Sequence, residues 1–189
     1  GDYWNNFEDE YIELRNITGF PVSLYHATHT SNTWKLDRAV EFPFPPNTTI
    51  AANAYVLVVN FNPLTHTAQR DAFRAKYGIS AAIPLFGPYK GDLSNGDETV
   101  ALYQPDTPEN SGANAGQVPY VLVDQVRYND QAPWPSTPDG FGQSLHRAAA
   151  AWLEQEGDVV EAVRHHQAAG DWAPAARLLV DNYLTLTMD

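Results

Sequence analysis

Proline and glycine occur throughout most of the chain and then almost disappear, and this change constrains the fold more than any single motif. Nearly all of the 14 prolines and 12 glycines precede Gly157, and only Pro174 follows Ala148 among the prolines. Frequent turn formers between short apolar stretches are typical of β architecture, whereas an alanine-rich tail without them is typical of helices. The 189 residues therefore predict a β-domain over residues 1–147 and an α-helical segment over residues 148–189.

Alternating apolar residues predict strands in the first domain. Ile12 and Leu14 alternate with charged residues, and Val100 and Leu102 share one face of a later segment. Tyr55–Val59 is the most apolar run, and its length and β-branching predict a strand buried on both faces. These patterns predict a mainly β fold.

Two further segments complete this domain. Residues 66–78 change to helical spacing and end at Gly78, which predicts one short helix inserted between strands. Residues 118–128 alternate again, with Val121, Val123 and Val126 among the apolar positions.

Residues 87–103 are the stretch around which the β-domain is organised. Asn95 and Gly96 tolerate positive φ and predict a tight hairpin turn ahead of the alternating residues. The stretch contains no obvious nucleophile, metal cluster or phosphate-binding loop, which favours a scaffold over an enzyme.

Three helices are predicted after the β-domain, over residues 145–156, 158–169 and 171–187. Gly157-Asp158 and Gly170-Asp171 each combine a helix stop with an N-cap. Apolar residues line one face of each helix, and they include Ala162, Val163, Ala175, Ala176 and Leu179. The stripe formed by Trp152, Trp172, Leu179 and Tyr183 is too large for three short helices to cover, so we expect self-association or a protein partner.

Residues 8–147 resemble a bacterial lamin tail domain. The matching pieces are Glu10-Tyr11-Ile12-Glu13-Leu14-Arg15-Asn16, Phe42 to Pro45 with Thr48-Thr49-Ile50, Tyr55–Val59, Phe73-Arg74-Ala75-Lys76-Tyr77-Gly78, residues 87–102, Val123 to Tyr128, and Trp134-Pro135 with Asp139 to Leu145. The resemblance implies an immunoglobulin-like β-sandwich that acts as a non-catalytic interaction module, often attached to large exported proteins. The family opens with an apolar strand that residues 1–7 do not supply, so we expect an exposed sheet edge.

Residues 145–189 are similar to the helical region of MalT-like, LuxR-type transcription regulators. The residues that carry the similarity are Leu145 to Glu154, Gly157 to His165 and Ala168 to Leu179. It implies tetratricopeptide-like helix packing, without the nucleotide-binding loop or the DNA-reading helices of that family. Two unrelated resemblances that meet at Leu145-His146-Arg147 suggest a chimera. They also imply different compartments, extracellular for the β-domain and cytoplasmic for the helices.

Charge and composition exclude several classes of function. The net charge of −12 repels phosphate backbones and anionic lipid surfaces, so we expect neither nucleic-acid nor membrane binding. Without cysteine there are no disulfides, thiolate metal sites or cysteine nucleophiles. No apolar run approaches the roughly 20 residues that span a bilayer. No signal peptide is visible, although the chain begins abruptly at Gly1.

Each candidate for chemistry has a simpler interpretation. His26 and His29 form a His-x-x-His pair that surface histidines explain better than a metal site. His165 and His166, together with Glu161, are likewise better explained as ordinary helix residues than as a metal site. Ser144, His146 and Asp139 are triad residue types without a nucleophile elbow. The carboxylates of Glu8, Asp9, Glu10, Asp92, Asp97 and Glu98 are compatible with calcium, but their spacing matches no EF-hand.

The sequence therefore predicts a non-catalytic structural or interaction module with no cofactor, catalytic or metal-ligating residues. Trp134, Trp152, Trp172 and Tyr183 are the predicted interaction residues, and Asn95 and Gly96 the structural turn. Two alternatives remain open. One is a calcium- or carbohydrate-dependent adhesion module, and the other is a protein-binding fragment of a transcription regulator.

Overall fold

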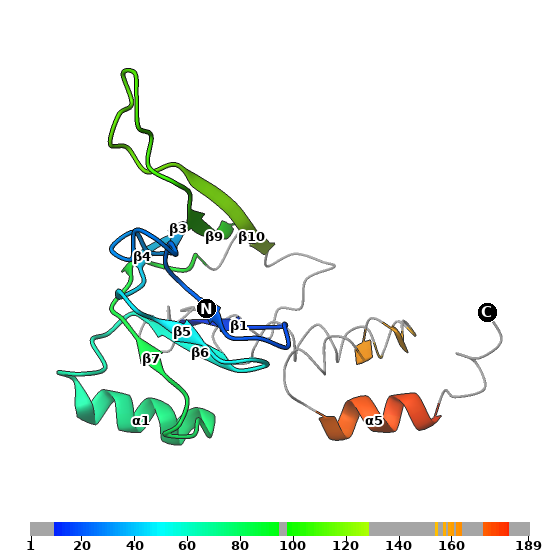
Figure 1. Ribbon diagram of the computed structural model, residues 1–189. Coiled ribbons are helices and arrows are strands. Elements are labelled where there is room, and N and C mark those ends of the chain that lie inside the picture. The colour runs from blue at the N-terminus through cyan, green and yellow to red at the C-terminus, as the bar shows by residue number, and fades with distance from the viewer. Residues whose placement is uncertain are drawn as a thin grey trace. The chain divides into compact units, whose positions relative to one another are not determined.

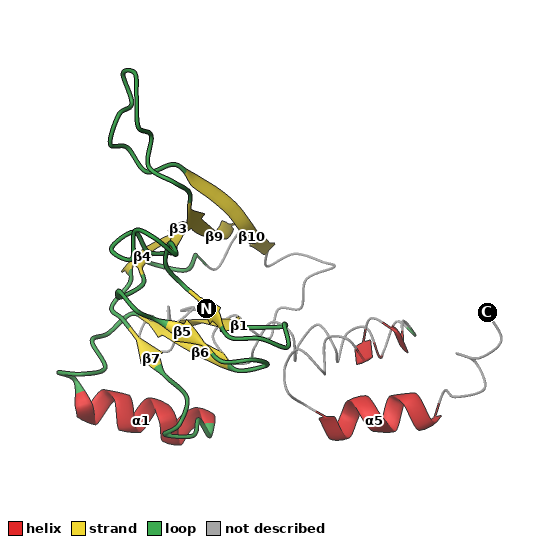
Figure 2. Cartoon of the chain, viewed as in Figure 1, coloured by secondary structure: helices red, strands yellow, loops and turns green. Residues whose placement is uncertain are grey.

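The computed structural model describes residues 10–94, 98–128, 154, 157, 159–160, 162–163 and 172–181 (Figures 1 and 2). The chain divides into two compact units, of which the first is Asn6–Tyr128 and the second combines Gly1–Asn5 with Asn129–Asp189. Each unit is described by itself below. The predicted boundary between residues 147 and 148 lies outside the described residues and stays a prediction.

The first unit is mainly β, as predicted. Its strands form a three-stranded sheet of order β1-β6-β7, a five-stranded sheet of order β10-β9-β3-β4-β8, and a short β2-β5 pair. The strands are β1 (Tyr11–Arg15), β2 (Val22–Ser23), β3 (Lys35–Arg38), β4 (Val40–Pro43), β5 (Thr49–Ile50), β6 (Tyr55–Val59), β7 (Leu85–Phe86), β8 (Lys90–Gly91), β9 (Glu98–Pro105) and β10 (Tyr120–Tyr128). All pairings are antiparallel except that of β6 with β7, which are joined through a helix.

The two larger sheets enclose a buried cluster that we call the sandwich core. Val56 and Val58 of β6 meet Leu36 of β3 there. Its other buried members are Leu24, Val40, Phe42, Phe44, Ile50 and Tyr89, and Val100 and Leu102 of β9 pack against it. The unit is thus a β-sandwich, and the predicted shared face of Val100 and Leu102 is confirmed.

A second buried cluster, the helix-side core, lies on the other face of the three-stranded sheet. The inserted helix α1 (Thr67–Tyr77) covers this face (Figure 1). Phe73 is its one buried residue and packs edge-on to Tyr11 and Phe61, with ring centroids 5.5 and 5.8 Å apart. Gly78 ends the helix at a φ of 65°, which glycine adopts at little cost. The predicted helix and its stop are confirmed.

Strand β6 contributes to both cores, as its sequence predicts. Val56 and Val58 belong to the sandwich core, and Leu57 and Val59 belong to the helix-side core. Each of these four residues is at most 2% exposed. An antiparallel neighbour, β1, and a parallel neighbour, β7, flank the strand on its two edges.

The predicted turn at Asn95 and Gly96 stays a prediction, because residues 95–97 lie outside the described residues. The strands on its two sides are described. The strands on either side, β8 and β9, are not neighbours, since β3 and β4 lie between them in the sheet order. The connection therefore crosses the sheet and does not join a two-stranded hairpin of β8 with β9. Local sequence predicts a turn, but the partners of its strands are set by the rest of the sheet.

The described part of the second unit is helical. α5 (Trp172–Asp181) is its one continuous described helix, within the predicted span of residues 171–187. Ala162, Val163, Ala175 and Leu178 form a small buried cluster. Ala176 and Leu179, which we predicted on the apolar face, are exposed, because the buried arc of α5 centres on Ala175 and Leu178. A 2.8 Å ion pair joins Arg177 to Glu154.

Candidate interaction surface

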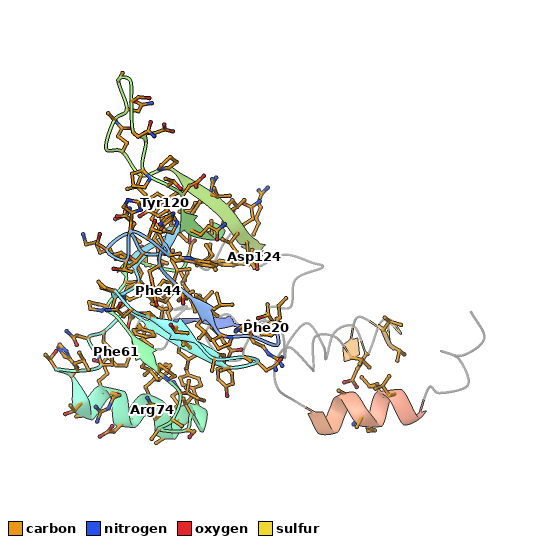
Figure 3. The ribbon with its side chains drawn as sticks, in the orientation of Figure 1. Phe20, Phe44, Phe61, Arg74, Tyr120 and Asp124 are labelled. Atoms are coloured by element: carbon orange, nitrogen blue, oxygen red, sulfur yellow. The ribbon has the colours of Figure 1, made fainter. Side chains whose placement is uncertain are left out.

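Strand β10 ends the described order of the five-stranded sheet, and it carries an exposed apolar surface. Every residue of β10 except Tyr128 is exposed. Its apolar members Tyr120, Val121, Leu122, Val123 and Val126 keep 38–45% of their surface in solvent. We call these five residues the β10 surface (Figure 3). A long apolar strand at a sheet edge is unusual, since such strands template pairing with other chains.

A β-bulge explains why apolar residues occur on both faces of β10. The register with β9 shifts between Leu122 and Asp124, so that Val123 is the extra residue. On either side of the bulge, Val121 and Val126 pair with Gln104 and Val100, on the face that β9 turns to the sandwich core. Tyr120 and Leu122 instead share the outward face. Simple alternation of polar and apolar residues therefore fails here.

The outward face is held in place by a lysine. The Lys35 ammonium lies 4.7 Å from the ring centroid of Tyr120 and 5.8 Å from that of Tyr103. The same ammonium is 2.6 Å from a carboxylate oxygen of Asp37. Cation–π contacts of this kind contribute roughly 0.5–1 kcal/mol at exposed positions. They keep the aromatic part of the surface in one arrangement, which lowers the entropy cost of binding.

The carboxylates of Glu10 and Glu98 lie near Tyr128, the last residue of β10, and each accepts hydrogen bonds from the protein. Glu10 Oε2 accepts the Tyr89 hydroxyl at 3.1 Å and the Leu93 amide at 3.0 Å. Glu98 Oε2 accepts the Tyr128 hydroxyl at 3.2 Å and the Ser94 amide at 2.7 Å. These hydrogen bonds connect β10 and the segment after β8 to the rest of the sandwich.

Electrostatics in this cluster reflect burial and crowded negative charge. Burial raises the pKa of Glu10 above its ordinary 4.5; the Asp92 and Glu98 carboxylates raise it further, against the lowering effect of its two hydrogen bonds. Burial likewise raises the pKa of Tyr89 and Tyr128, and nearby carboxylates add to both shifts. Both tyrosines therefore stay protonated hydrogen-bond donors at neutral pH.

The predicted interaction residues Trp134, Trp152 and Tyr183 lie outside the described residues, as do the predicted turn residues Asn95 and Gly96. Trp172 begins α5, but its side chain is not among those described. Six further candidate residues lie outside the described residues: Asp139, Ser144, His146, Glu161, His165 and His166. His26 and His29 are both described, and their rings lie together.

The structure adds a surface that the sequence did not indicate as functional. Val121, Leu122 and Val123 form an unbroken apolar run in the sequence. This run departs from the alternation of a half-buried strand and could have indicated the surface. Among the described residues, no set of three or more His, Cys, Asp and Glu side chains is arranged to hold a metal ion.

Comparisons with known proteins found no matching family model, curated protein or solved structure. Within the described part of the chain, no helix has the length and apolar character needed to cross a bilayer.

Proposed function

We propose that the chain is a non-catalytic structural or interaction module whose first unit is an immunoglobulin-like, lamin-tail-like domain that binds protein through the β10 surface. The observation that carries this proposal is the exposure of five apolar side chains on one strand at the end of a sheet. Exposed apolar side chains gathered along one strand are typical of protein interaction sites.

Strand addition is the binding mode that this geometry favours. An extended segment that pairs with β10 would obtain main-chain hydrogen bonds along a strand of nine residues. The side chains of Val121 and Leu122 lie on opposite faces of β10, so a partner strand could contact one of them on each face. The partner is either another protein or a second copy of this chain.

Sedimentation across a concentration series tests the proposal, with photo-crosslinking as a second readout. Leu122→Asp places a charge on the outward face and should abolish association. It should also abolish crosslinking to a protein partner from a photoreactive residue placed at position 121. Leu64→Asp is the matched control, because Leu64 is 83% exposed and lies outside β10. Equal association of both variants, or no protein crosslink from position 121, would contradict the proposal.

Calcium-dependent adhesion is the first alternative. Glu10 and Glu98 with Asp92 bring negative charge together, as calcium sites require. However, amide and hydroxyl donors of the protein already occupy an oxygen of each glutamate. A calcium-dependent rise in melting temperature that disappears in Asp92→Asn would favour this alternative over the interaction module.

A protein-binding fragment of a transcription regulator is the second alternative, and the helical second unit would carry it. Binding that survives deletion of residues 8–147 would favour it. Whether the chain is a chimera is a separate matter, which the continuity of the genomic reading frame across residues 145–151 decides.

A further inference from the structure

The rings of His26 and His29 converge in a short loop of the first unit. Their Nδ1 atoms lie 3.3 Å apart and their ring centroids 5.0 Å apart. The two histidines come from residues 26–32, which we call the histidine loop; His26 is half-buried and His29 is exposed. This pair has no part in the proposed β10 surface.

Backbone hydrogen bonds close the histidine loop at both ends. The His26 amide donates to the Asn32 carbonyl at 2.8 Å, and the Asn32 amide donates to the His29 carbonyl at 2.8 Å. A β-bridge between Tyr25 and Thr33 extends this closure. The backbone thus holds the two rings near each other before any ligand arrives, which reduces the ordering cost of chelation.

The separation of the nitrogens fits one tetrahedral metal ion. Two nitrogens that each bind zinc at about 2.05 Å with a tetrahedral angle are about 3.3 Å apart, with ring centroids about 5.2 Å apart. The observed values are 3.3 and 5.0 Å. In the absence of an ion, the same 3.3 Å separation is that of a hydrogen bond between the two rings, which a bound ion would replace.

Hydrogen bonding favours the tautomer of His26 that binds metal through Nδ1. The amides of Thr28 and His29 point at His26 Nδ1 from 3.3 and 3.2 Å, so this nitrogen carries a lone pair. On the other side of the ring, His26 Nε2 lies 3.4 Å from the Thr107 hydroxyl oxygen, which can accept a hydrogen bond from its N–H. Metal-binding histidines commonly have such an outer partner. A metal ion bound at Nδ1 would displace both amide contacts, and water would then hydrate these two exposed amides.

The geometry points to a zinc site in which Nδ1 of His26 and Nδ1 of His29 bind one ion and water completes its coordination. Imidazole nitrogen is a preferred ligand for zinc. With two protein ligands, the site binds more weakly than structural zinc sites with four. A site of this affinity responds to the zinc concentration around the protein and does not serve as a folding element.

Zinc titration of the full chain by calorimetry tests this site. We expect His26→Ala and His29→Ala each to weaken zinc binding about 100-fold, because each leaves a single nitrogen without the chelate. Thr28→Val removes a hydroxyl that lies 3.0 Å from His29 Nδ1 and should leave the affinity within about twofold, since the hydroxyl is not a ligand.

Two controls isolate the histidine loop. His66→Ala removes another exposed histidine whose Nδ1 contacts a threonine hydroxyl at 3.0 Å, and it should leave zinc binding unchanged. A His165→Ala, His166→Ala double variant should also bind as the original chain does. Zinc binding that persists in His26→Ala, or that is lost in Thr28→Val or in the double variant, would overturn the assignment.

Discussion

At the scale of single residues, Asn16 does more than its place in a turn suggests. Its buried side chain donates to the carbonyls of Phe20, Ile50 and Ala51 at 2.7, 3.1 and 3.0 Å. Its Oδ1 accepts the amide and hydroxyl of Thr18 at 2.9 and 2.8 Å. One side chain thus ties the turn after β1 to the end of β5, 34 residues away.

Replacing Asn16 by alanine should therefore cost about 2–3 kcal/mol of unfolding free energy, because buried carbonyls and an amide lose their partner. Asn62→Ala is the control. Asn62 caps the exposed amides of Leu64 and Thr65, where water can substitute, so we expect a loss below about 1 kcal/mol. Urea unfolding of both variants measures the difference, and equal losses would contradict the role of Asn16.

Glu10 predicts a pH dependence of stability. Its pKa is raised in the folded protein, so the contribution of Glu10 to stability is complete below the unfolded value and is lost as the pH rises through the folded pKa. Glu10→Gln removes this loss while keeping an acceptor. Relative to the original chain, the variant should become more stable as the pH is raised from about 4.5 toward neutral.

Urea unfolding at both ends of that pH window measures the gain. Glu41→Gln, on an exposed position of β4, should show no comparable change with pH. A difference between Glu10→Gln and the original chain that stays constant with pH would count against the buried, crowded environment of Glu10.

At the scale of elements, the sequence predicted those helices and strands whose own residues show a clear period or stop. β6 and α1 have enough residues to show their periods, and Gly78 ends the helix where the sequence indicates. The two-residue strands β5, β7 and β8 are too short for any period, and only their neighbours define them. The β10 surface was missed because periodicity shows which residues share a face but not whether that face finds a partner.

The pairing of β8 with β4 depends on a close approach that only glycine permits. Gly91 has a φ of 91°, and a Cβ there would lie 2.6 Å from the carbonyl oxygen of Ala39. We expect Gly91→Ala to lower the unfolding free energy by about 2 kcal/mol or more, through strain and overlap together.

Two other glycines separate these causes. Gly112 has a φ of 76° with open space around it, so Gly112→Ala should cost only about 1 kcal/mol of strain. Gly19 has open space without this conformation, and its change to alanine should be close to neutral. Thermal unfolding that ranks Gly112 or Gly19 as more sensitive than Gly91 would refute the close-approach argument.

At the scale of the whole molecule, the chain is two units, and the first has its own cores and hydrogen bonds. A fragment spanning Asn6–Tyr128 is therefore expected to unfold cooperatively, with a chemical shift pattern close to that of the same residues in the full chain. Heteronuclear NMR and calorimetry of the fragment provide the measurement. A fragment without dispersed resonances would show that the first unit depends on the second.

The shared strand β6 determines how the first unit comes apart. Because successive residues of β6 alternate between the sandwich core and the helix-side core, β6 cannot leave one core without the other core losing its β6 contacts as well. The two cores should then behave as one cooperative unit in native-state hydrogen exchange. Phe73→Ala, made on the helix side alone, should accelerate exchange at Leu36 and Val58 by the same factor as at Leu57. Unequal factors would reveal two separately unfolding layers.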